Sequence, residues 1–200
     1  MNNIPSGNVT FLFTDIEGST KLAQENNQAY IASLGVHHEI LYDVIDSNNG
    51  FVFKIIGDSL CCAFDNPFDA AEAAIKAQIR LKSNDWKGSV IKVRMGIHSG
   101  EAEFVKDDYS GYVTLSRVQR IMSLAHGGQI IVSEIFYNAL KENKESKISF
   151  KDFGERKLKD IIIPEHIYQI VSEGLVQSFP PIKSLDARQN NLPSSVSKFI

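Results

Sequence analysis

The sequence predicts an α+β domain in which helices cover one face of a sheet. Short runs with an apolar and polar alternation, typical of strands, recur along the chain. Longer segments with apolar residues at helical spacing lie between these runs. One pair of neighbouring strand-like runs is joined by a two-residue turn and therefore predicts a hairpin. Strands that alternate with helices, together with a hairpin, are typical of this class.

The first half of the chain supplies a strand, two helices and the hairpin. Residues 9–14 alternate and predict a strand buried mainly on one side. Residues 18–45 predict two helices in succession. A turn separates them from the hairpin over residues 51–64, which has Gly57 and Asp58 at its tip.

The second half continues the same pattern. Residues 67–79 keep helical spacing after a proline that suits a first turn. The remaining elements that we expect are a strand over 91–97, a polar loop over 107–111, a helix over 113–124, a short strand over 129–132, a helix capped by Ser133, and two or three strands up to Ile170. From about residue 173, Pro and Asn recur without helical or strand period. We therefore expect one domain over residues 1–172 and a linker or tail over 173–200.

Composition excludes several classes of function. The formal net charge of −3 and the pI near 6.0 do not predict a nucleic-acid-binding surface. Cys61 and Cys62 are neighbours in a strand and point to opposite faces, so we expect two small buried side chains and no disulfide. We find no signal-peptide pattern and no apolar run of membrane-spanning length. A cytoplasmic protein without a membrane partner is expected.

Asp15 and Asp58 point most directly to chemistry. Asp15 ends the first strand, and Asp58 lies at the hairpin tip. Carboxylates and substrate phosphates commonly hold Mg²⁺ together, and a pair of such ions recurs in phosphoryl chemistry. Alternatively, Asp15 caps a helix and Asp58 merely forms the turn. Either residue alone favours that alternative at roughly two to one, whereas the neighbouring motifs favour the metal site.

Two further features suit a nucleotide. Residues 16–20 place a glycine and free backbone N–H groups at a helix start, where anions bind; capping by Ser19 or Thr20 is the alternative. Lys54 lies in an apolar strand, where an unpaired ammonium is costly. It either extends to solvent or reads a ligand in a cleft. Four strand residues span about 13 Å, so Lys54 should not join its own Asp58 at the metals.

The helix over 113–124 carries the remaining candidates. Ser116 and Arg120 lie one turn apart on one face, and Arg suits the charge that develops on a phosphoryl group. With Arg117 they could equally form a solvated basic face, which is the favoured interpretation for this motif alone. For His98 and His126, a packed or helix-end role is favoured over catalysis.

Together these residues resemble the class III nucleotidyl cyclases. The resemblance runs from about Gly7 to Val171 and rests on four segments in a fixed order, residues 13–20, 54–58, 94–101 and 123–129. It implies a ferredoxin-like βαββαβ core with additional strands and helices. It also implies a head-to-tail homodimer with catalytic sites at the interface.

The resemblance implies a role for each candidate residue. Two Mg²⁺ or Mn²⁺ ions per site would be held by Asp15, Asp58 and the carbonyl of Ile16. The backbone around Glu17, Gly18, Ser19 and Thr20 would hold phosphates. A basic residue of the segment 156–159 would also meet the triphosphate, and Lys159 is the favoured candidate. From the partner subunit, Lys54 and Asp108 would read the base and Arg120 would stabilise the transition state. The reaction would be attack of the ribose 3′-hydroxyl on the α-phosphorus with release of pyrophosphate.

Ser116 departs from the family pattern. The family usually has an Asn there, which orients the ribose, and residues 111–120 are one residue longer than the common pattern. Serine still donates and accepts a hydrogen bond but is shorter. Lower or substrate-shifted activity is therefore expected rather than loss.

The Lys54 and Asp108 pair resembles the adenine-selective pattern. We therefore expect an adenylate cyclase, a phosphorus–oxygen lyase that makes cyclic AMP from ATP for signal transduction; GTP, CTP or UTP are alternative substrates. The rival classes are a non-catalytic nucleotide-binding or dimerisation module and a polymerase-like nucleotidyltransferase. The charge balance speaks against the last, which needs a basic groove.

The tail carries a second resemblance. Residues 179–188 and 191–193 look like the linker that, in large bacterial regulators, joins a cyclase domain to a P-loop ATPase and helical repeats. This implies that the chain leads to further domains in a longer protein.

Overall fold

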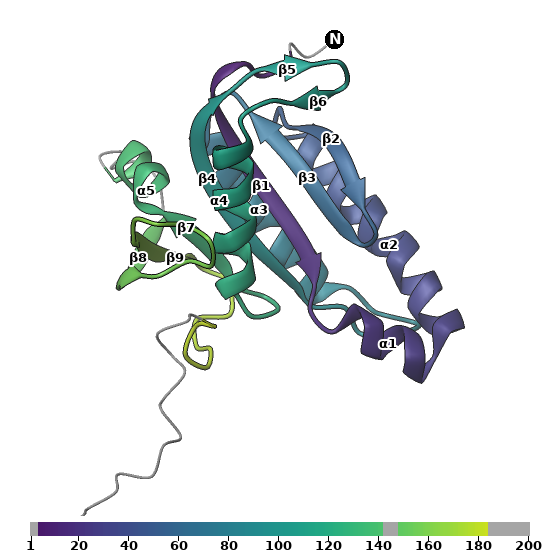
Figure 1. Cartoon of the computed structure of the whole chain (residues 1–200). Helices are drawn as coiled ribbons and strands as arrows, with labels where there is room; N and C mark the ends of the chain where they lie inside the picture. Colours follow the sequence, from purple (N-terminus) through teal and green to yellow (C-terminus); the bar gives the residue numbers. More distant parts are fainter. Residues whose placement is uncertain (1–3, 142–147, 184–200) are drawn as a thin grey trace, which may run out of the picture.

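The computed structural model describes residues 4–141 and 148–183. In these residues a seven-stranded sheet has the strand order β2-β3-β1-β4-β7-β9-β8 (Figure 1). Its strands are β1 (Gly7–Ile16), β2 (Phe51–Ile56), β3 (Ser59–Phe64), β4 (Val93–Ala102), β7 (Ile130–Ser133), β8 (Ser149–Arg156) and β9 (Glu165–Val171). A separate small hairpin joins β5 (Phe104–Val105) to β6 (Asp108–Tyr109). The helices are α1 (Ser19–Glu25), α2 (Asn27–Asp46), α3 (Pro67–Ser83), α4 (Tyr112–Leu124) and α5 (Glu134–Leu140).

The first four long strands form the ferredoxin-like core. The chain runs β1, helices, β2, β3, α3, β4, and β1 pairs antiparallel with both β3 and β4. β7 then adds parallel to β4, and β9 and β8 continue the sheet by antiparallel pairing. The predicted α+β class with additional strands and helices is confirmed.

Helices cover both faces of the sheet, so the expectation of one covered face is wrong. In Figure 1, α4 crosses one side of β1 while α3 lies on the other. Leu12 and Ile16 of β1 pack in the cluster that contains residues of α2 and α3, whereas Phe11 and Phe13 pack with Val118 of α4. Cys61 and Cys62 divide between the same two clusters as free, buried thiols.

Strand β1 is consequently buried on both sides, which also corrects the expectation of a one-sided strand. Its threonines are buried because their hydroxyl groups find partners in neighbouring strands. Thr10 Oγ1 lies 2.8 Å from Ser99 Oγ, and Thr14 Oγ1 accepts a hydrogen bond from the Leu60 N–H at 3.3 Å. Threonine, which counts as a polar residue in the alternating pattern of β1, is thus compatible with the core.

The described part of the segment after β9 packs on the domain. Leu175 belongs to the main core cluster, and Ile182 packs in a smaller cluster beneath α4. The boundary at residue 172 stays a prediction, and residues 184–200 lie outside the described part. Among the helices that the structure describes, none is long and apolar enough to cross a membrane.

Gly96 sets the distance between α4 and the sheet. An ideal Cβ at this position of β4 would lie 2.5 Å from the backbone nitrogen of Met122 in α4. No side chain fits there without moving backbone. The absence of a side chain at Gly96 therefore allows α4 to lie directly on the strands.

We expect Gly96→Ala to lower the free energy of unfolding by about 1–3 kcal/mol, because α4 must move away from the sheet. Gly35→Ala is the matched control, since an added Cβ at Gly35 in α2 meets nothing within 4 Å. This control should raise stability by about 0.5–1 kcal/mol, the helical preference for Ala over Gly. Urea denaturation measures both; equal stability of Gly96→Ala and the unsubstituted chain would contradict the packing argument.

Candidate active site

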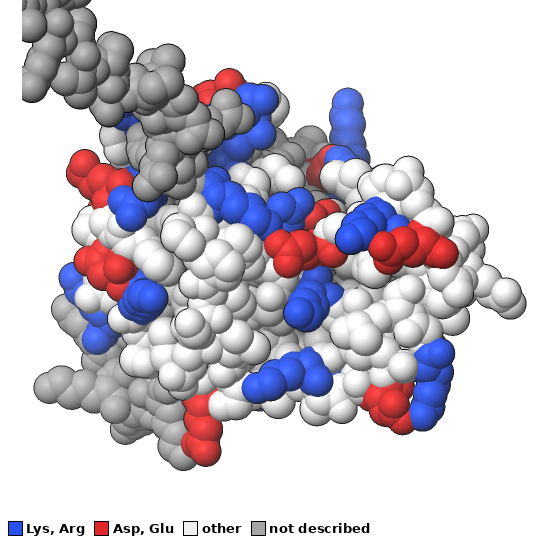
Figure 2. Space-filling view, turned by 90° about the horizontal axis from the view of Figure 1, so that it is seen from below, with Lys and Arg blue, Asp and Glu red and all other residues white. Residues whose placement is uncertain are grey.

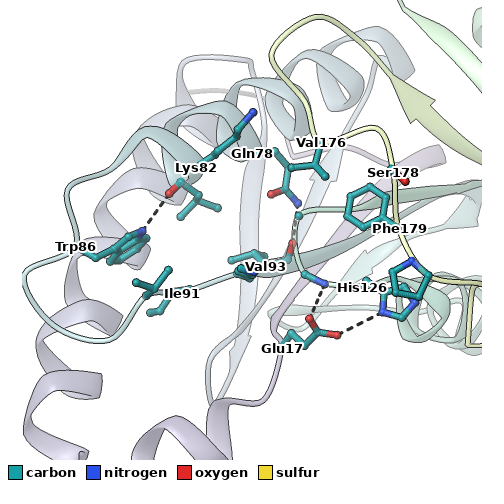
Figure 3. Close-up of a pocket in the computed structure, with 16 residues that line it drawn as sticks. Glu17, Gln78, Lys82, Trp86, Ile91, Val93, His126, Val176, Ser178 and Phe179 are labelled. Carbon is teal, nitrogen blue, oxygen red and sulfur yellow. Dashed lines mark hydrogen bonds and ion pairs between the residues drawn. The ribbon is translucent and has the colours of Figure 1, made fainter.

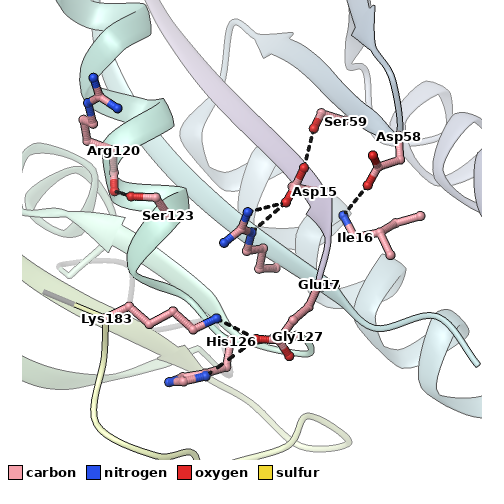
Figure 4. Close-up of polar contacts among 11 residues, drawn as sticks. Asp15, Ile16, Glu17, Asp58, Ser59, Arg120, Ser123, His126, Gly127 and Lys183 are labelled. Atoms are coloured by element: carbon pink, nitrogen blue, oxygen red, sulfur yellow. Dashed lines mark hydrogen bonds and ion pairs between the residues drawn. The ribbon is translucent and has the colours of Figure 1, made fainter. Parts of the chain in front are cut away.

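Asp15 and Asp58 come together where β1 ends beside the β2–β3 turn (Figure 4). Asp58 Oδ2 accepts a hydrogen bond from the Ile16 N–H at 3.0 Å. Asp15 Oδ1 accepts one from Ser59 Oγ at 2.6 Å. The hairpin tip is therefore bonded to the strand end, and two carboxylates from distant parts of the sequence share one edge of the sheet.

Arg94 is a member of this site that the sequence analysis missed. Its Nε and Nη2 atoms lie 2.7 and 2.5 Å from Asp15 Oδ2, and Asp15 and Arg94 are opposite each other in the β1–β4 register. An arginine between Val93 and Met95 in an apolar strand is a signal that could have been noticed. Its partner could not, because sequence alone does not give the cross-strand register.

The donor set fits a hard divalent cation that is shared with phosphates. The described residues contain no group of three or more His, Cys, Asp or Glu side chains that could hold a metal. Asp15, Asp58 and the Ile16 carbonyl offer oxygen ligands only. Mg²⁺ is usually held by one or two carboxylates plus substrate phosphates, so the small number of carboxylates suits this cation.

The turn between β1 and α1 leaves its backbone N–H groups without a side-chain cap. The N-cap of α1 is Gly18, with φ of 72° and no side-chain cap hydrogen bond. Neither Asp15 nor Ser19 nor Thr20 therefore caps this helix through its side chain. The positive φ suits glycine, which allows the tight exit from β1.

The Glu17 side chain turns away from this edge. Its Oε2 accepts a hydrogen bond from the Gly127 N–H at 3.0 Å, and its Oε1 accepts one from Lys183 Nζ at 2.6 Å. Burial opposes ionisation of Glu17, but Lys183 and the Gly127 N–H outweigh it, so the pKa lies below its ordinary value. The Glu17 backbone N–H also has a partner, because it donates a hydrogen bond to the Lys92 carbonyl oxygen at 2.9 Å.

Lys54 and Asp108 form an ion pair in a cavity away from the two carboxylates. Lys54 comes from β2 and Asp108 from β6, and both side chains are nearly half exposed. The hydrogen bond between them raises the pKa of Lys54 and lowers the pKa of Asp108. Phe13 and Phe53 are among the residues that line this cavity of about 360 Å³. As expected, Lys54 is oriented toward Asp108 and not toward Asp58.

Helix α4 contributes Ser116 and Arg120 to the same cavity. Both residues also line an adjoining cavity of about 450 Å³, which includes Lys159. Arg120 Nη2 lies 2.8 Å from Asp160 Oδ2. Arg117, in contrast, pairs with Glu165 of β9 at 3.4 Å. The structure thus brings together Lys54, Asp108, Ser116, Arg120 and Lys159 as one group.

Asp15 and Asp58, here called the carboxylate edge, lie apart from Lys54, Asp108, Ser116, Arg120 and Lys159, here called the α4 group, within one chain. Asp15 and Asp58 line neither cavity of the α4 group. Figure 4 shows Arg120 on α4 with its side chain directed away from the two carboxylates. One chain therefore carries two distinct sets of candidate residues.

The two candidate histidines have structural contacts. His98 is buried with Nδ1 2.8 Å from Ser133 Oγ, and burial lowers its pKa to about 3, helped by the charge of Arg117. His126 Nδ1 lies 3.7 Å from Glu17 Oε1, and its Nε2 lies 3.0 Å from the Pro181 carbonyl oxygen. Neither contact places these rings at the Asp15 carboxylate.

The fold and these motifs define a nucleotide cyclase domain. The family pattern of the adenylate and guanylate cyclase catalytic domain matches residues 1–171. The chain belongs to this family.

The chain is also similar to individual proteins and solved structures. An uncharacterized protein of Mycobacterium tuberculosis is 27% identical over 199 residues, which are 98% of this chain and 67% of the relative. A solved structure of adenylate cyclases from Trypanosoma brucei in their monomeric state superimposes with a TM-score of 0.82 at 23% identity, covering 90% of this chain and 96% of that one. The guanylate cyclase domain of RhGC from Catenaria anguillulae, in complex with GTP, gives 0.73 at 19% identity, covering 83% and 97%.

Proposed function

We propose that this domain is an adenylate cyclase that forms 3′,5′-cyclic AMP and pyrophosphate from ATP at the interface of a homodimer. The division of the candidate residues supports this proposal most directly. One chain presents a carboxylate pair at one place and a base-sized cavity with a catalytic-type arginine at another. Two chains packed head to tail would bring the carboxylate edge of one opposite the α4 cavity of its partner.

Exposed apolar side chains support such an interface. Tyr112 and Val113 at the start of α4 are 83% and 63% exposed, and Ile162 beside the second cavity is 98% exposed. Large apolar side chains grouped on a surface commonly mark a protein contact. A twofold axis would make this contact isologous and give two equivalent sites.

The proposed chemistry divides the work among the residues of both chains. Asp15, Asp58 and the Ile16 carbonyl hold two Mg²⁺ or Mn²⁺ ions, and the backbone of 17–20 binds the phosphates. Ions of this kind, when bound, lower the pKa of the attacking 3′-hydroxyl and neutralise triphosphate charge. Arg120 supports the charge that builds at the α-phosphoryl group, Ser116 orients the ribose, and Lys159 binds the triphosphate.

The Lys54–Asp108 pair supports adenine as the base. Asp108 can accept a hydrogen bond from an exocyclic amino group, and Lys54 can donate to a ring nitrogen. Their ion pair holds both groups at the mouth of a cavity lined in part by Phe13 and Phe53. The aromatic walls suit the flat face of a base.

A polymerase-like transferase is less well supported. On the face in Figure 2, acidic and basic side chains are interspersed over a mostly uncharged surface. A nucleic-acid groove would require a continuous basic stripe. The second candidate that we keep is a non-catalytic nucleotide-binding or dimerisation module, which Ser116 favours because it shortens the polar group facing the ribose.

We further propose that residues 173–200 lead to an ATPase and helical repeats in a longer, cytoplasmic signalling protein. The support is the resemblance of residues 179–188 and 191–193 to the linker of such regulators. The intact mass of the native product measures this directly.

The first test incubates the chain with ATP, GTP, CTP or UTP and Mg²⁺ or Mn²⁺, and identifies products by mass. We expect cyclic AMP from ATP, and Asp15→Ala or Asp58→Ala should reduce its formation by about 100-fold or more, because phosphate charge is no longer neutralised. Nucleotide binding without any cyclic product would favour the module. Substantial cyclisation by both variants would contradict the metal assignment.

Lys54→Met should change base choice and leave folding intact. The loss of one charged hydrogen-bond donor should reduce the preference for ATP over GTP by about 10-fold, measured as the ratio of kcat/KM values. The melting temperature should hardly change, because both side chains of the ion pair are nearly half exposed and solvent screens their attraction. An unchanged ATP preference in a folded variant would show that Lys54 does not read the base.

Ser116→Asn should maintain or raise turnover of ATP. An amide is longer than a hydroxyl and offers both a donor and an acceptor to the ribose. Ser116→Ala is the control and should lower kcat by about 10-fold, the effect of one lost hydrogen bond. A large drop in product formation by Ser116→Asn would count against the assignment of this position to the ribose.

A further inference from the structure

Residues 174–183, here called the strap, run back over the domain after β9. The first half of the strap is anchored on α3. Lys82 Nζ donates a hydrogen bond to the Gly174 carbonyl oxygen at 3.0 Å, and Leu175 is buried in the main core. Figure 3 shows Val176 and Phe179 of the strap facing Trp86 across a cavity of about 410 Å³.

The second half of the strap is fixed to the end of α4. Ile182 is only 4% exposed and packs with Ile121 and Leu124. The Lys183 N–H donates to the Leu124 carbonyl oxygen at 3.0 Å. The last carbonyls of a helix lack partners inside the helix, so the strap satisfies one of them. The backbone of Lys183 is thus held at the C-terminal end of the helix that carries Ser116 and Arg120.

The Lys183 side chain then reaches the turn after β1. Its Nζ lies 2.6 Å from Glu17 Oε1, while Glu17 Oε2 accepts a hydrogen bond from the N–H of Gly127, which follows α4 (Figure 4). Glu17 directly follows Ile16 and begins the stretch proposed to bind phosphates. A single residue of the strap therefore contacts both the end of α4 and the turn next to the metal ligands.

The ion pair by itself would contribute little to stability. The side chains of Lys183 and Glu17 are 39% and 36% exposed, and solvent screens the attraction in pairs of this kind. Its geometry is nevertheless fixed, because Ile182 is buried next to Lys183 and Glu17 has a second bond to Gly127. A weak ion pair with a fixed geometry suits a contact that positions the turn after β1 rather than one that stabilises the fold.

We propose that Lys183 and Glu17 are positioning residues, through which the strap fixes the turn after β1 relative to helix α4. This inference rests on the proposed function. In the proposed dimer, Asp15 and Arg120 of one chain serve different sites, so the strap of each chain would contact elements of both. A small displacement of a reacting group can cost up to about 100-fold in rate.

The test uses the full 200-residue chain and compares Lys183→Met with Lys183→Arg. We expect Lys183→Met to lower kcat by about 10-fold, a fraction of the loss that misplacement can cause. The ratio of activities on ATP and GTP should not change, because Lys54 and Asp108 do not contact the strap. Lys183→Arg keeps the charge and should restore most of the rate. Lys82→Met is the matched control, which removes the strap contact to the Gly174 carbonyl oxygen but leaves the Lys183–Glu17 pair in place, and it should leave kcat unchanged.

Hydrogen–deuterium exchange of the segment 16–22 gives a readout that does not depend on catalysis. Exchange there should quicken in Lys183→Met but not in Lys82→Met, while both variants keep their melting temperature. If neither the unsubstituted protein nor any variant cyclises a nucleotide but the exchange difference is present, the proposed function is overturned and the positioning role stands. Unchanged exchange and kcat in Lys183→Met, or equal losses in Lys82→Met, would overturn the positioning role itself.

Discussion

The antiparallel register of β1 with its two neighbours is the constraint on which the candidate site depends. Pairing with β4 sets Arg94 opposite Asp15, and pairing with β3 sets Leu60 opposite Thr14, which leaves the hairpin tip beside Ile16. A slip of one residue would turn every side chain of β1 to the other face. Because both faces are buried, such a slip would displace apolar residues on both sides, and the carboxylates are held by the packing of the whole strand.

The close approach of α4 to the sheet is the second requirement. Gly96 allows this helix to lie on β4, and Phe11 and Phe13 form the surface that it covers. The same helix presents Ser116 and Arg120 on its other side. One packing contact therefore buries a face of β1 and forms a wall of the cavity that Lys54 and Asp108 also line.

Local patterns predicted much of this fold. The strand of residues 9–14, the Gly57–Asp58 hairpin and the helix capped by Ser133 follow from alternation, turn chemistry and capping, and all three are present. The burial of β1 on both faces was not predicted, because Thr10 and Thr14 look polar until their partners in other strands are known. Whether a sheet is covered on one face or two depends on tertiary packing, which no single segment reveals.

The candidate site residues were named from their sequence motifs and from the family resemblance. The structure pairs Lys54 with Asp108 and places Asp15 and Asp58 outside the cavity that this pair shares with Arg120, and the roles of these residues stay predictions. Arg94 and Lys183 were missed for a common reason. Each acts through a contact across more than 75 residues of sequence, and only the folded chain brings such partners together.

The charged groups proposed to meet the nucleotide already pair with one another within one chain. Asp15 pairs with Arg94, Lys54 with Asp108, and Arg120 with Asp160. The last two pairs are partly exposed, so solvent screens them, and a base or a phosphate could replace either partner at small cost. The Asp15–Arg94 pair is more buried and is held by a hydrogen bond from Arg94 Nε and an ion-pair contact of Nη2, so its rearrangement is costlier. In the proposed reaction, the triphosphate and its cations would therefore have to compete with Arg94 for the Asp15 carboxylate.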